Sequence, residues 1–257
     1  MTKPRSYQTE AIIIKKTKLG EAGRILTLYT PLRGKLQGVA KGVRRPRSKL
    51  SGHLELLTYS QVWFARGRNI DTITGCQTIN GFIELKSHLE LTSIALYATE
   101  LVNLFTAEHI ENQPLFRLLL ETMERLAADA DSRLALRYFE LHLLDKVGYR
   151  PRLRQCTACH QPLAAVSNFF CPPSGGMLCP TCAVEQPTAF TVSVNALKVL
   201  CYLQEKDFAA ASRLRLSPEL EKELEGLLRS YLGYLLEREV KSATWLDSLR
   251  EQALPGP

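Results

Sequence analysis

The chain has 257 residues, a net charge of +7 and 45% hydrophobic residues, enough for one large domain or two to three small ones with a sizeable core. The N-terminus MTKPRSYQTE lacks the apolar stretch of a secretory signal, and no apolar run approaches the roughly 20 residues of a membrane span. We therefore expect a cytoplasmic protein without a membrane span, whose seven cysteines are mostly reduced.

The positive charge is concentrated at the N-terminal end. Residues 1–68 hold 15 Lys and Arg against three acidic residues, a balance of +12, and the remainder sums to −5. General solubility explains a net charge but not its segregation, so this end is expected to bind an acidic partner. Nucleic acid is the commonest polyanion, and a membrane surface or another acidic ligand is the alternative.

Residues 7–80 have the pattern of short β-strands separated by turn residues. The expected strands cover residues 9–16, 24–30, 35–41, 54–65 and 70–79. Five such strands indicate a small barrel or sandwich, and the OB-type barrel of many oligonucleotide binders fits this number.

The most basic segment lies inside this region. Residues 33–50 carry seven basic side chains and no acid. Gly34, Gly38 and Gly42 permit a close approach to a ligand, and Pro46 blocks a helix. We predict one positive, phosphate-binding face made of Arg24, Arg33, Lys35, Lys41, Arg44, Arg45, Arg47, Lys49, Arg66 and Arg68. In the alternative, residues 44–49 form a disordered arm that binds without a fixed geometry.

Aromatic residues in the same strands have two possible roles. Tyr29, Tyr59, Trp63 and Phe64 can stack on bases or form the barrel core. Because alternate residues of a strand face opposite sides, one of Trp63 and Phe64 is expected to point outward.

From residue 81 the pattern changes to helices. Ser87 and Glu90 have the spacing of a capping box before a helix over 88–109. Pro114 suits the first turn of a second helix, to about residue 128. Ser132 can cap a third helix over 133–147, which Gly148 ends. Further helices are expected over 194–204, where Ser193 is the cap, over 207–213, and after Ser217.

A cysteine module interrupts the helices. Cys156-x2-Cys159 is followed after 19 residues by Cys179-x2-Cys182. Two such pairs present four sulfurs to one ion, which predicts a closed, structural Zn²⁺ site without catalysis. Replacement of one ligand by Cys171, haem attachment at CTACH and a redox pair are the alternatives.

No motif of an enzyme active site is found. The P-loop, the nucleophile elbow G-x-S-x-G, the zinc protease motif H-E-x-x-H and the dinucleotide fingerprint are all missing. Cys76 and Cys201 are expected to be small core residues. The sequence therefore favours a binding protein over an enzyme.

These patterns predict an α+β multidomain chain with an N-terminal five-stranded OB-type β-barrel and a helical domain interrupted by a four-cysteine zinc module. The expected parts are the nucleic-acid-binding barrel over 1–80, the first part of the helical domain over 81–150, the zinc-binding module over 151–190, the C-terminal helical part over 191–250 and a flexible tail over 251–257.

Several segments resemble a known family. GEAGRILTLYTPLRGKLQGVAKGVRRPRSKL (20–50), FARGRNIDTITGC (64–76), the cysteine module (156–182) and REVKSATWLDSL (238–249) are similar to the RecO family of bacterial recombination mediators. The resemblance spans nearly the whole chain. Family members commonly carry Asp where Gly23 stands, which leaves the pairing of the neighbouring Arg24 open.

The resemblance implies a function in DNA repair. Such proteins bind single- and double-stranded DNA and anneal complementary strands coated by single-strand binding protein. They help to load the RecA recombinase together with RecR, use no nucleotide cofactor and act in the cytoplasm, at the nucleoid after damage. Some members lack the zinc cysteines, which implies a structural metal.

Two alternative functions and one additional partner site are also considered. A zinc-containing, ribosome-associated RNA-binding module would share the basic barrel, and a metal-dependent nuclease would need acids that the barrel region lacks. The helical domain can also hold a pocket for an acidic tail of single-strand binding protein, with Arg125, Arg133 and Arg137 as candidate contacts.

Overall fold

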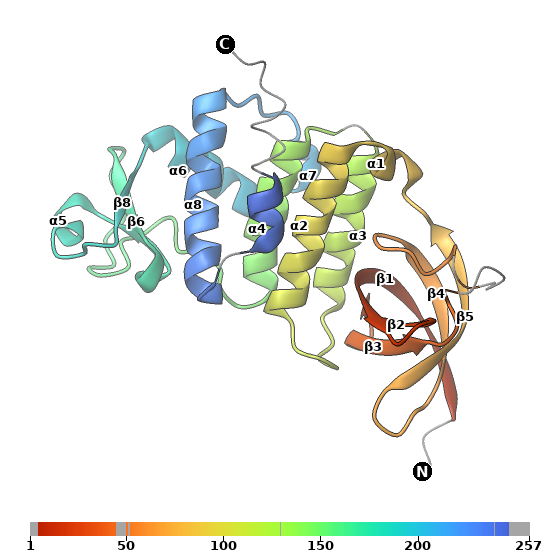
Figure 1. Cartoon of the computed structure of the whole chain (residues 1–257). Helices are drawn as coiled ribbons and strands as arrows, with labels where there is room; N and C mark the ends of the chain where they lie inside the picture. The colour runs from red at the N-terminus through yellow and green to blue at the C-terminus, as the bar shows by residue number, and fades with distance from the viewer. Residues whose placement is uncertain (1–4, 45–49, 51, 129, 239, 247–257) are drawn as a thin grey trace. The chain divides into compact units, whose positions relative to one another are not determined.

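The structure is a computed structural model that describes residues 5–44, 50, 52–128, 130–238 and 240–246. The chain divides into two compact units, Met1–Ala128 with Ser242–Pro257, and Asp129–Lys241, and each is described by itself (Figure 1). Arg45, Arg47, Lys49 and the expected tail over 251–257 lie outside the described residues.

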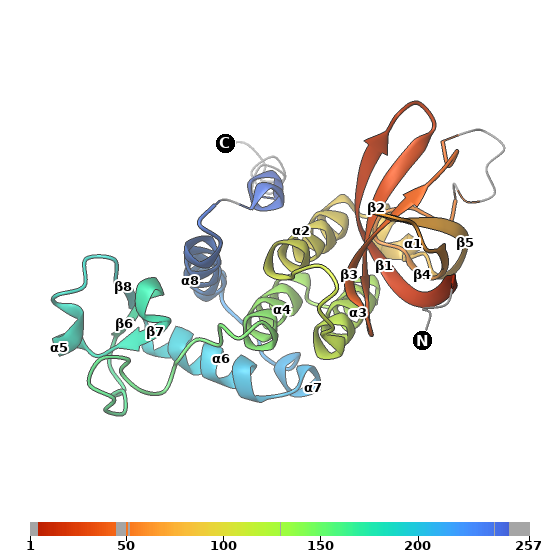
Figure 2. The same ribbon diagram turned by 90° about the horizontal axis from the view of Figure 1, so that it is seen from below.

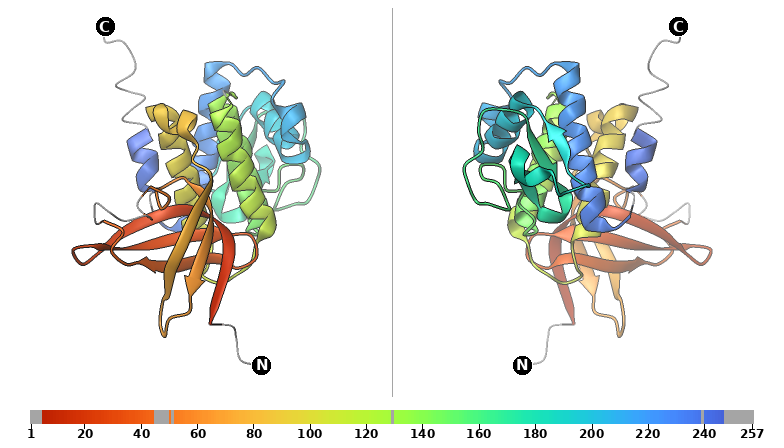
Figure 3. Two further views of the ribbon diagram at one scale, coloured as in Figure 1. Left: turned by 90° about the vertical axis from the view of Figure 1, so that its right-hand side faces the viewer. Right: turned by 90° about the vertical axis from the view of Figure 1, so that its left-hand side faces the viewer.

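The first unit begins with a closed five-stranded barrel in the order β1-β2-β3-β5-β4 (Figure 3). Its strands are β1 (Ser6–Leu19), β2 (Gly23–Thr30), β3 (Gly34–Ala40), β4 (Tyr59–Ala65) and β5 (Asp71–Asn80). A parallel pairing of β3 with β5 at Gly38 and Asp71 closes the barrel, and the other strand pairs are antiparallel. The predicted OB-type barrel is confirmed.

Inward-facing side chains fill the barrel. Its buried core contains Ala11, Ile13, Leu26, Leu28, Ala40, Val43, Leu54, Val62, Phe64 and Ile73. Complete burial of one large aliphatic or aromatic side chain stabilises a fold by about 1.5–3 kcal/mol. In β4 the alternation of buried and half-buried residues is regular, as expected for a strand with one face toward a core.

The predicted strand over 54–65 is too long at its start. Leu57 adopts a left-handed backbone with φ 56°, which a strand does not tolerate. Its N–H donates to the carbonyl of Ile13, and the N–H of Ile13 donates to Thr58. The segment before Tyr59 is therefore fastened to β1 by a turn, and the ladder with β1 extends only from Tyr59 to Ala65.

In the first unit the barrel is followed along the chain by α1 (Ile83–Ser87), α2 (Leu89–Phe105) and α3 (Gln113–Ala127). The capping-box prediction was wrong, because His88 is the N-cap of α2 without a side-chain bond. Ser87 instead ends α1, and its hydroxyl donates to Glu84. Asn112 caps α3 and accepts a hydrogen bond from Leu115.

The second unit contains α4 (Ser132–Lys146), α6 (Val194–Glu205), α7 (Phe208–Ala211) and α8 (Pro218–Leu236). α4 packs against α6 and α8. The predicted caps Ser193 and Ser217 each accept a backbone hydrogen bond. The third predicted cap shifts by one residue, because Asp131 rather than Ser132 accepts the bonds at the start of α4.

A small antiparallel sheet and a short helix lie between α4 and α6 in the sequence (Figure 2). The sheet has the order β7-β6-β8, made of β6 (Asn168–Cys171), β7 (Gly176–Leu178) and β8 (Phe190–Val192). The 3₁₀ turn η1 (Pro172–Ser174) joins β6 to β7, and α5 (Pro180–Ala183) follows β7. Among the described residues, no helix has the length and apolar character needed to cross a bilayer.

Candidate nucleic-acid interface and metal centre

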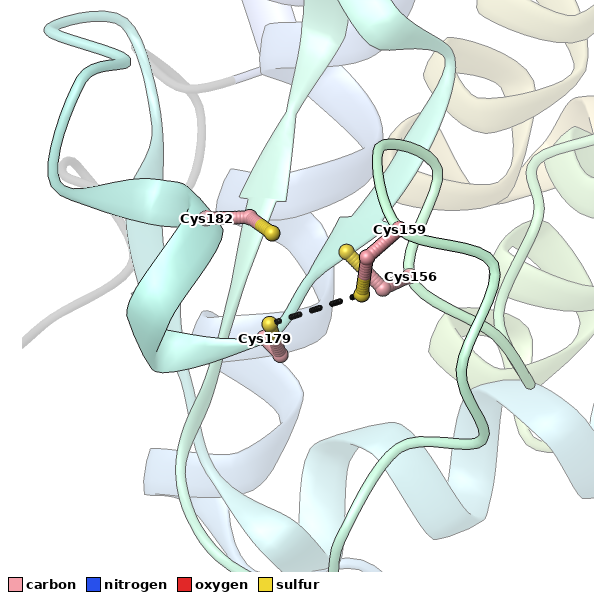
Figure 4. Close-up of side chains that lie close together, drawn as sticks. All are labelled: Cys156, Cys159, Cys179 and Cys182. Atoms are coloured by element: carbon pink, nitrogen blue, oxygen red, sulfur yellow. Dashed lines mark hydrogen bonds between the residues drawn. The ribbon is translucent and has the colours of Figure 1, made fainter.

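The four cysteines of the two pairs converge in the second unit. The sulfurs of Cys156, Cys159, Cys179 and Cys182 all lie within 4.8 Å of one another (Figure 4). The Sγ atoms of Cys159 and Cys179 are 4.0 Å apart. Four thiolates placed tetrahedrally at about 2.3 Å from a zinc ion would lie about 3.8 Å from one another. The donor set therefore fits a tetrahedral thiophilic ion.

Backbone hydrogen bonds shape the first cysteine pair. The N–H of Cys156 donates to Gln161, and the N–H of His160 donates back to Cys156, both at 2.9 Å. His160 has a left-handed backbone with φ 61°, which closes the turn. Thr157 donates to the carbonyl of Met177 at 2.8 Å and so fastens this turn to β7.

The second pair is placed by the end of β7 and by α5. Cys179 is the N-cap residue of α5, and Cys182 lies in that helix. Gly176 in β7 leaves room for the first segment, because an added Cβ would lie 2.5 Å from the carbonyl oxygen of Arg152. The glycine therefore permits the close contact that brings the two pairs together.

The thiols of the cluster differ in pKa. Burial acts to raise the pKa of Cys156, but backbone N–H groups of residues 158, 159 and 179 outweigh it and lower the pKa to about 6. Hydrogen bonds with the other three sulfurs, that of Cys179 foremost, raise the pKa of Cys182 to about 12. Such a cluster collects negative charge as it ionises, which a divalent cation would neutralise.

The remaining cysteines are not members of this four-sulfur cluster. Cys171 is buried beside it, but its sulfur accepts a hydrogen bond from Ser174 at 3.3 Å and lies 3.8 Å from Thr188. The geometry therefore gives no support to a ligand exchange with Cys171. Cys76 packs against the barrel core, and the half-buried Cys201 donates a weak bond to Leu153.

Seven of the described basic residues in the barrel region form two groups. The first, which we call the hairpin group, contains Lys18, Arg24, Lys41 and Arg44. Arg24 is the second residue of β2 and the partner of Lys18 in β1 and of Ala40, the last residue of β3. The N–H of Arg44 donates to Ala22, so the turn after β3 lies beside the turn of the β1–β2 hairpin, which projects from the barrel (Figure 2).

Arg24 has an acidic neighbour from elsewhere in the chain. Its Nη1 lies 3.5 Å from a carboxylate oxygen of Glu55, which also pairs with Lys16. Exposed ion pairs of this kind stabilise a fold by only about 0–1 kcal/mol. Glu55 therefore supplies the negative charge that Gly23 lacks, without removing Arg24 from the surface.

The second group, which we call the Tyr7 group, contains Tyr7, Arg33, Arg66 and Arg68. The guanidinium carbons of Arg33 and Arg66 lie 4.4 Å and 5.0 Å from the centre of the Tyr7 ring. The Tyr7 hydroxyl donates to Asp71 at 2.7 Å, and Arg68 is exposed in the β4–β5 loop. Sequence reasoning missed Tyr7, because only the register of β1 on β4 shows what surrounds it.

The two groups lie at opposite ends of the β2–β3 ladder. That ladder extends from Arg24 opposite Ala40 to Thr30 opposite Gly34, and Arg33 is in the turn beyond its second end. The structure therefore resolves the expected positive face into two separate clusters of charge.

The ammonium of Lys35 is bound at the end of α2 and not in either group. Its ammonium donates to the carbonyls of Asn103 and Thr106, at 2.7 Å and 2.5 Å, at the end of α2. The backbone carbonyl of Lys35 also accepts a bond from His109. These contacts occupy the ammonium that was expected to bind DNA, and we leave Lys35 out of the proposed interface.

Two of the three glycines expected to approach a ligand instead approach the protein itself. An added Cβ at Gly34 would lie 1.8 Å from the carbonyl oxygen of Ile110. One at Gly38 would lie 2.8 Å from the Phe64 ring and 2.9 Å from Ile73. Gly42 has φ +66° and forms the turn after β3. Packing within the protein and the turn after β3 therefore account for these three glycines.

The aromatic residues divide between core and surface. Tyr29 and Phe64 are fully buried, and half-buried Tyr59 packs on Phe116 of α3 with its hydroxyl donating to Glu10. Trp63 is half-buried and covers Gly75 of β5. Of the pair Trp63 and Phe64, the tryptophan is the residue that points outward.

The three arginines predicted to hold an acidic tail all have carboxylate partners. Arg125, in the first unit, pairs with Glu121 at 2.7 Å. In the second unit, Arg133 pairs with Glu221 at 2.9 Å. Arg137 is buried with Glu140 at 3.2 Å, so it is removed from the surface that a tail would contact.

An OB-type barrel with exposed arginines, combined with helices and a four-cysteine site, is the layout of a protein that works on nucleic acid. The family model described as "Recombination protein O N terminal" matches residues 1–82, and "Recombination protein O C terminal" matches residues 86–244. The chain belongs to the Recombination protein O (RecO) family.

Relatives of similar length support this assignment. The chain is 50% identical over 249 residues to "DNA repair protein RecO" of Dehalococcoides mccartyi, which covers 97% of this chain and 98% of the relative. It is 43% identical over 247 residues to the protein of that name from Roseiflexus sp. strain RS-1, with 96% and 87% covered. The corresponding protein of Desulforamulus reducens is 34% identical over 248 residues, with 96% of each chain covered.

Proposed function

We propose that this protein is a recombination mediator in DNA repair. It binds single- and double-stranded DNA, anneals complementary strands coated by single-strand binding protein, and helps RecR to load RecA. It acts as a binding protein without a nucleotide cofactor. The observation that carries this proposal is the pair of exposed cationic groups on the OB-type barrel of a RecO family member.

Both cationic groups suit contacts with the DNA backbone. Arginine and lysine side chains that neutralise phosphates release counterions, and this gives affinity without sequence preference. A mediator must act at any damaged sequence, so backbone contacts are the kind it needs. Trp63, the outward-facing aromatic residue, supplies a flat surface on which an unpaired base can stack, for about 1–3 kcal/mol per base.

A structural zinc ion completes the proposal. Cys156, Cys159, Cys179 and Cys182 would hold it, and when bound it would stabilise a segment whose own buried cluster is small. Four protein ligands leave no position for a substrate or water. The zinc is therefore assigned to folding of the second unit and not to DNA chemistry.

Annealing of complementary DNA strands coated with the cognate single-strand binding protein tests the function. Without ATP, the wild-type protein is expected to accelerate annealing, and the acceleration should fade as salt rises. The control is the triple variant Arg44→Glu, Arg45→Glu and Arg47→Glu, which should lose DNA binding and annealing while it stays folded. Unchanged affinity of that variant would refute the proposed hairpin contact.

Two further arms separate the alternatives. Matched single-stranded DNA, duplex DNA and RNA are compared, because a ribosome-associated module would prefer RNA. DNA is also incubated with the protein and magnesium or manganese, and cleavage would contradict a purely mediating role. Pull-down of purified RecR and of single-strand binding protein then tests the proposed partners directly.

A further inference from the structure

The Tyr7 ring brings two like charges to one place on the barrel. The guanidinium carbons of Arg33 and Arg66 both lie within 5.0 Å of its centre. The other aromatic neighbour is Phe64, which stacks on Tyr7 at 5.0 Å with the ring planes 11° apart. Since Phe64 is a fully buried core residue, the Tyr7 ring is anchored to the barrel interior.

Hydrogen bonds fix the orientation of that ring. The Tyr7 hydroxyl donates to Oδ2 of Asp71, and Oδ1 of the same carboxylate accepts from the N–H of Gly67, at 2.9 Å. Burial, and then the bond to Asp71, raise the pKa of Tyr7 above its ordinary value, so the phenol keeps its proton under physiological conditions. The Asp71 charge is thereby engaged by two donors.

The backbone on which each arginine stands is held as well. The N–H of Arg33 donates to the side chain of buried Thr30 at 3.2 Å, and the Thr30 hydroxyl donates to Gly34 at 2.9 Å. On the other side, the N–H of Arg66 donates to the carbonyl of Arg5 at 2.9 Å. Both arginines therefore stand on backbone that hydrogen bonds hold in place, and both are exposed at the surface.

We propose that Arg33 and Arg66 form one preorganised site for a single backbone phosphate of nucleic acid, and that Tyr7 is the residue that positions them. This inference rests on the proposed DNA-binding function and adds to it a defined phosphate site and a positioning residue. A phosphate offers several oxygens at 2.7–2.9 Å to guanidinium N–H groups, so one phosphate suits two arginines.

The chemistry of the cluster explains why an anion is the expected ligand. Two positive groups close together repel each other, and a ring face offsets only part of that repulsion. A phosphate between them converts the repulsion into two attractions. Arginines already held on an aromatic ring also lose less side-chain freedom when they bind, which raises affinity through preorganisation.

A double-mutant cycle on single-stranded DNA tests the positioning role. Tyr7→Leu in the full-length protein should weaken affinity roughly 5- to 30-fold, the effect of losing two exposed cation–π contacts. The salt dependence should stay unchanged, because no charge is removed. In a protein that already carries Arg33→Gln and Arg66→Gln, the same change of Tyr7 should have no effect on affinity.

Tyr59→Leu is the matched control, because Tyr59 is also a half-buried barrel tyrosine whose hydroxyl donates to a carboxylate, that of Glu10. It should leave DNA affinity per folded molecule unchanged. Equal weakening by Tyr7→Leu with and without the two arginines would show a purely structural role and overturn the inference. So would an unchanged affinity of Tyr7→Leu in the otherwise wild-type protein.

If Tyr7→Leu does not fold, a second measurement tests whether the two arginines share one phosphate. Arginines that share one phosphate predict that Arg33→Gln with Arg66→Gln lowers the slope of log K against log salt by about 0.7, the value for one phosphate on single strands. A decrease of about 1.4 would assign two phosphates and overturn the inference, while DNA binding by the barrel would stand. A wild-type protein without DNA affinity would overturn the proposed function as well.

Discussion

Replacement of Cys179 by Ser tests the metal centre most directly. A serine hydroxyl has nearly the size of the thiol but does not ionise at neutral pH, so the variant loses one of four thiolate ligands. Zinc binding is worth about 10–16 kcal/mol in zinc-finger peptides, which is about 2.5–4 kcal/mol per ligand if all four contribute equally. The buried cluster around the site consists of Cys156, Cys171, Leu178 and Ala183, too little apolar surface to offset such a loss.

The assay combines zinc content with urea unfolding. We expect Cys179→Ser to bind zinc more weakly and to lose about 3 kcal/mol of unfolding free energy in the second unit. The matched control, Cys171→Ser, changes a buried cysteine outside the four-sulfur cluster and should keep its zinc. DNA affinity per folded molecule should persist, since the proposed contacts lie in the first unit. A zinc-free variant with wild-type stability would refute the structural role.

Three further predictions concern salt, packing and pH. If about six phosphates are neutralised, log K for single strands should fall with log salt at a slope of about −4 to −5, and titrations at several salt concentrations measure it. Gly34→Ala should destabilise the first unit by about 3 kcal/mol, because alanine is strained at φ +60° and its Cβ would lie 1.8 Å from the Ile110 oxygen. The control Gly226→Ala, where nothing lies within 4 Å, should stabilise α8 by about 0.5–1 kcal/mol. Equal effects of the two substitutions in chemical denaturation would contradict this reasoning. Burial holds the pKa of His142 below 6.5, so the unfolded chain takes up a proton first as pH falls. The free energy of unfolding should therefore decrease as pH decreases through 6.5. Denaturation series across this range should show a weaker decrease of that free energy in His142→Gln.

Local signals in the sequence were sufficient to predict most of the helices and strands. Short apolar, β-branched or alternating segments bounded by turn residues located all five barrel strands, because these patterns depend only on neighbours in the chain. Ser193 and Ser217 were identified as caps for the same reason. The cysteine cluster was also predictable, since a C-x2-C turn fixes two ligands by itself and a metal needs two such turns.

Residues whose partners are distant in sequence were not predictable. From the sequence, Lys35 is predicted to contact DNA. In the structure its ammonium donates to backbone carbonyls at the end of α2. Arg137 is read as a surface charge until α4 is seen to bury it with Glu140. Tyr7 gave no signal at all, because its arginines come from the β2–β3 turn and the end of β4. Charge and residue type alone do not distinguish a binding side chain from a structural one.

Separation of the cationic groups bears on how the proposed annealing would work. The β2–β3 ladder has seven residue pairs between Arg24 and Thr30, which span about 20 Å at roughly 3.3 Å per residue. That distance exceeds the Debye length of about 8 Å at physiological salt, so in the proposed mechanism the hairpin group and the Tyr7 group would act on nearby phosphates independently. Two strands can then be neutralised at different places on one barrel, and neither strand needs to displace the other before their bases meet.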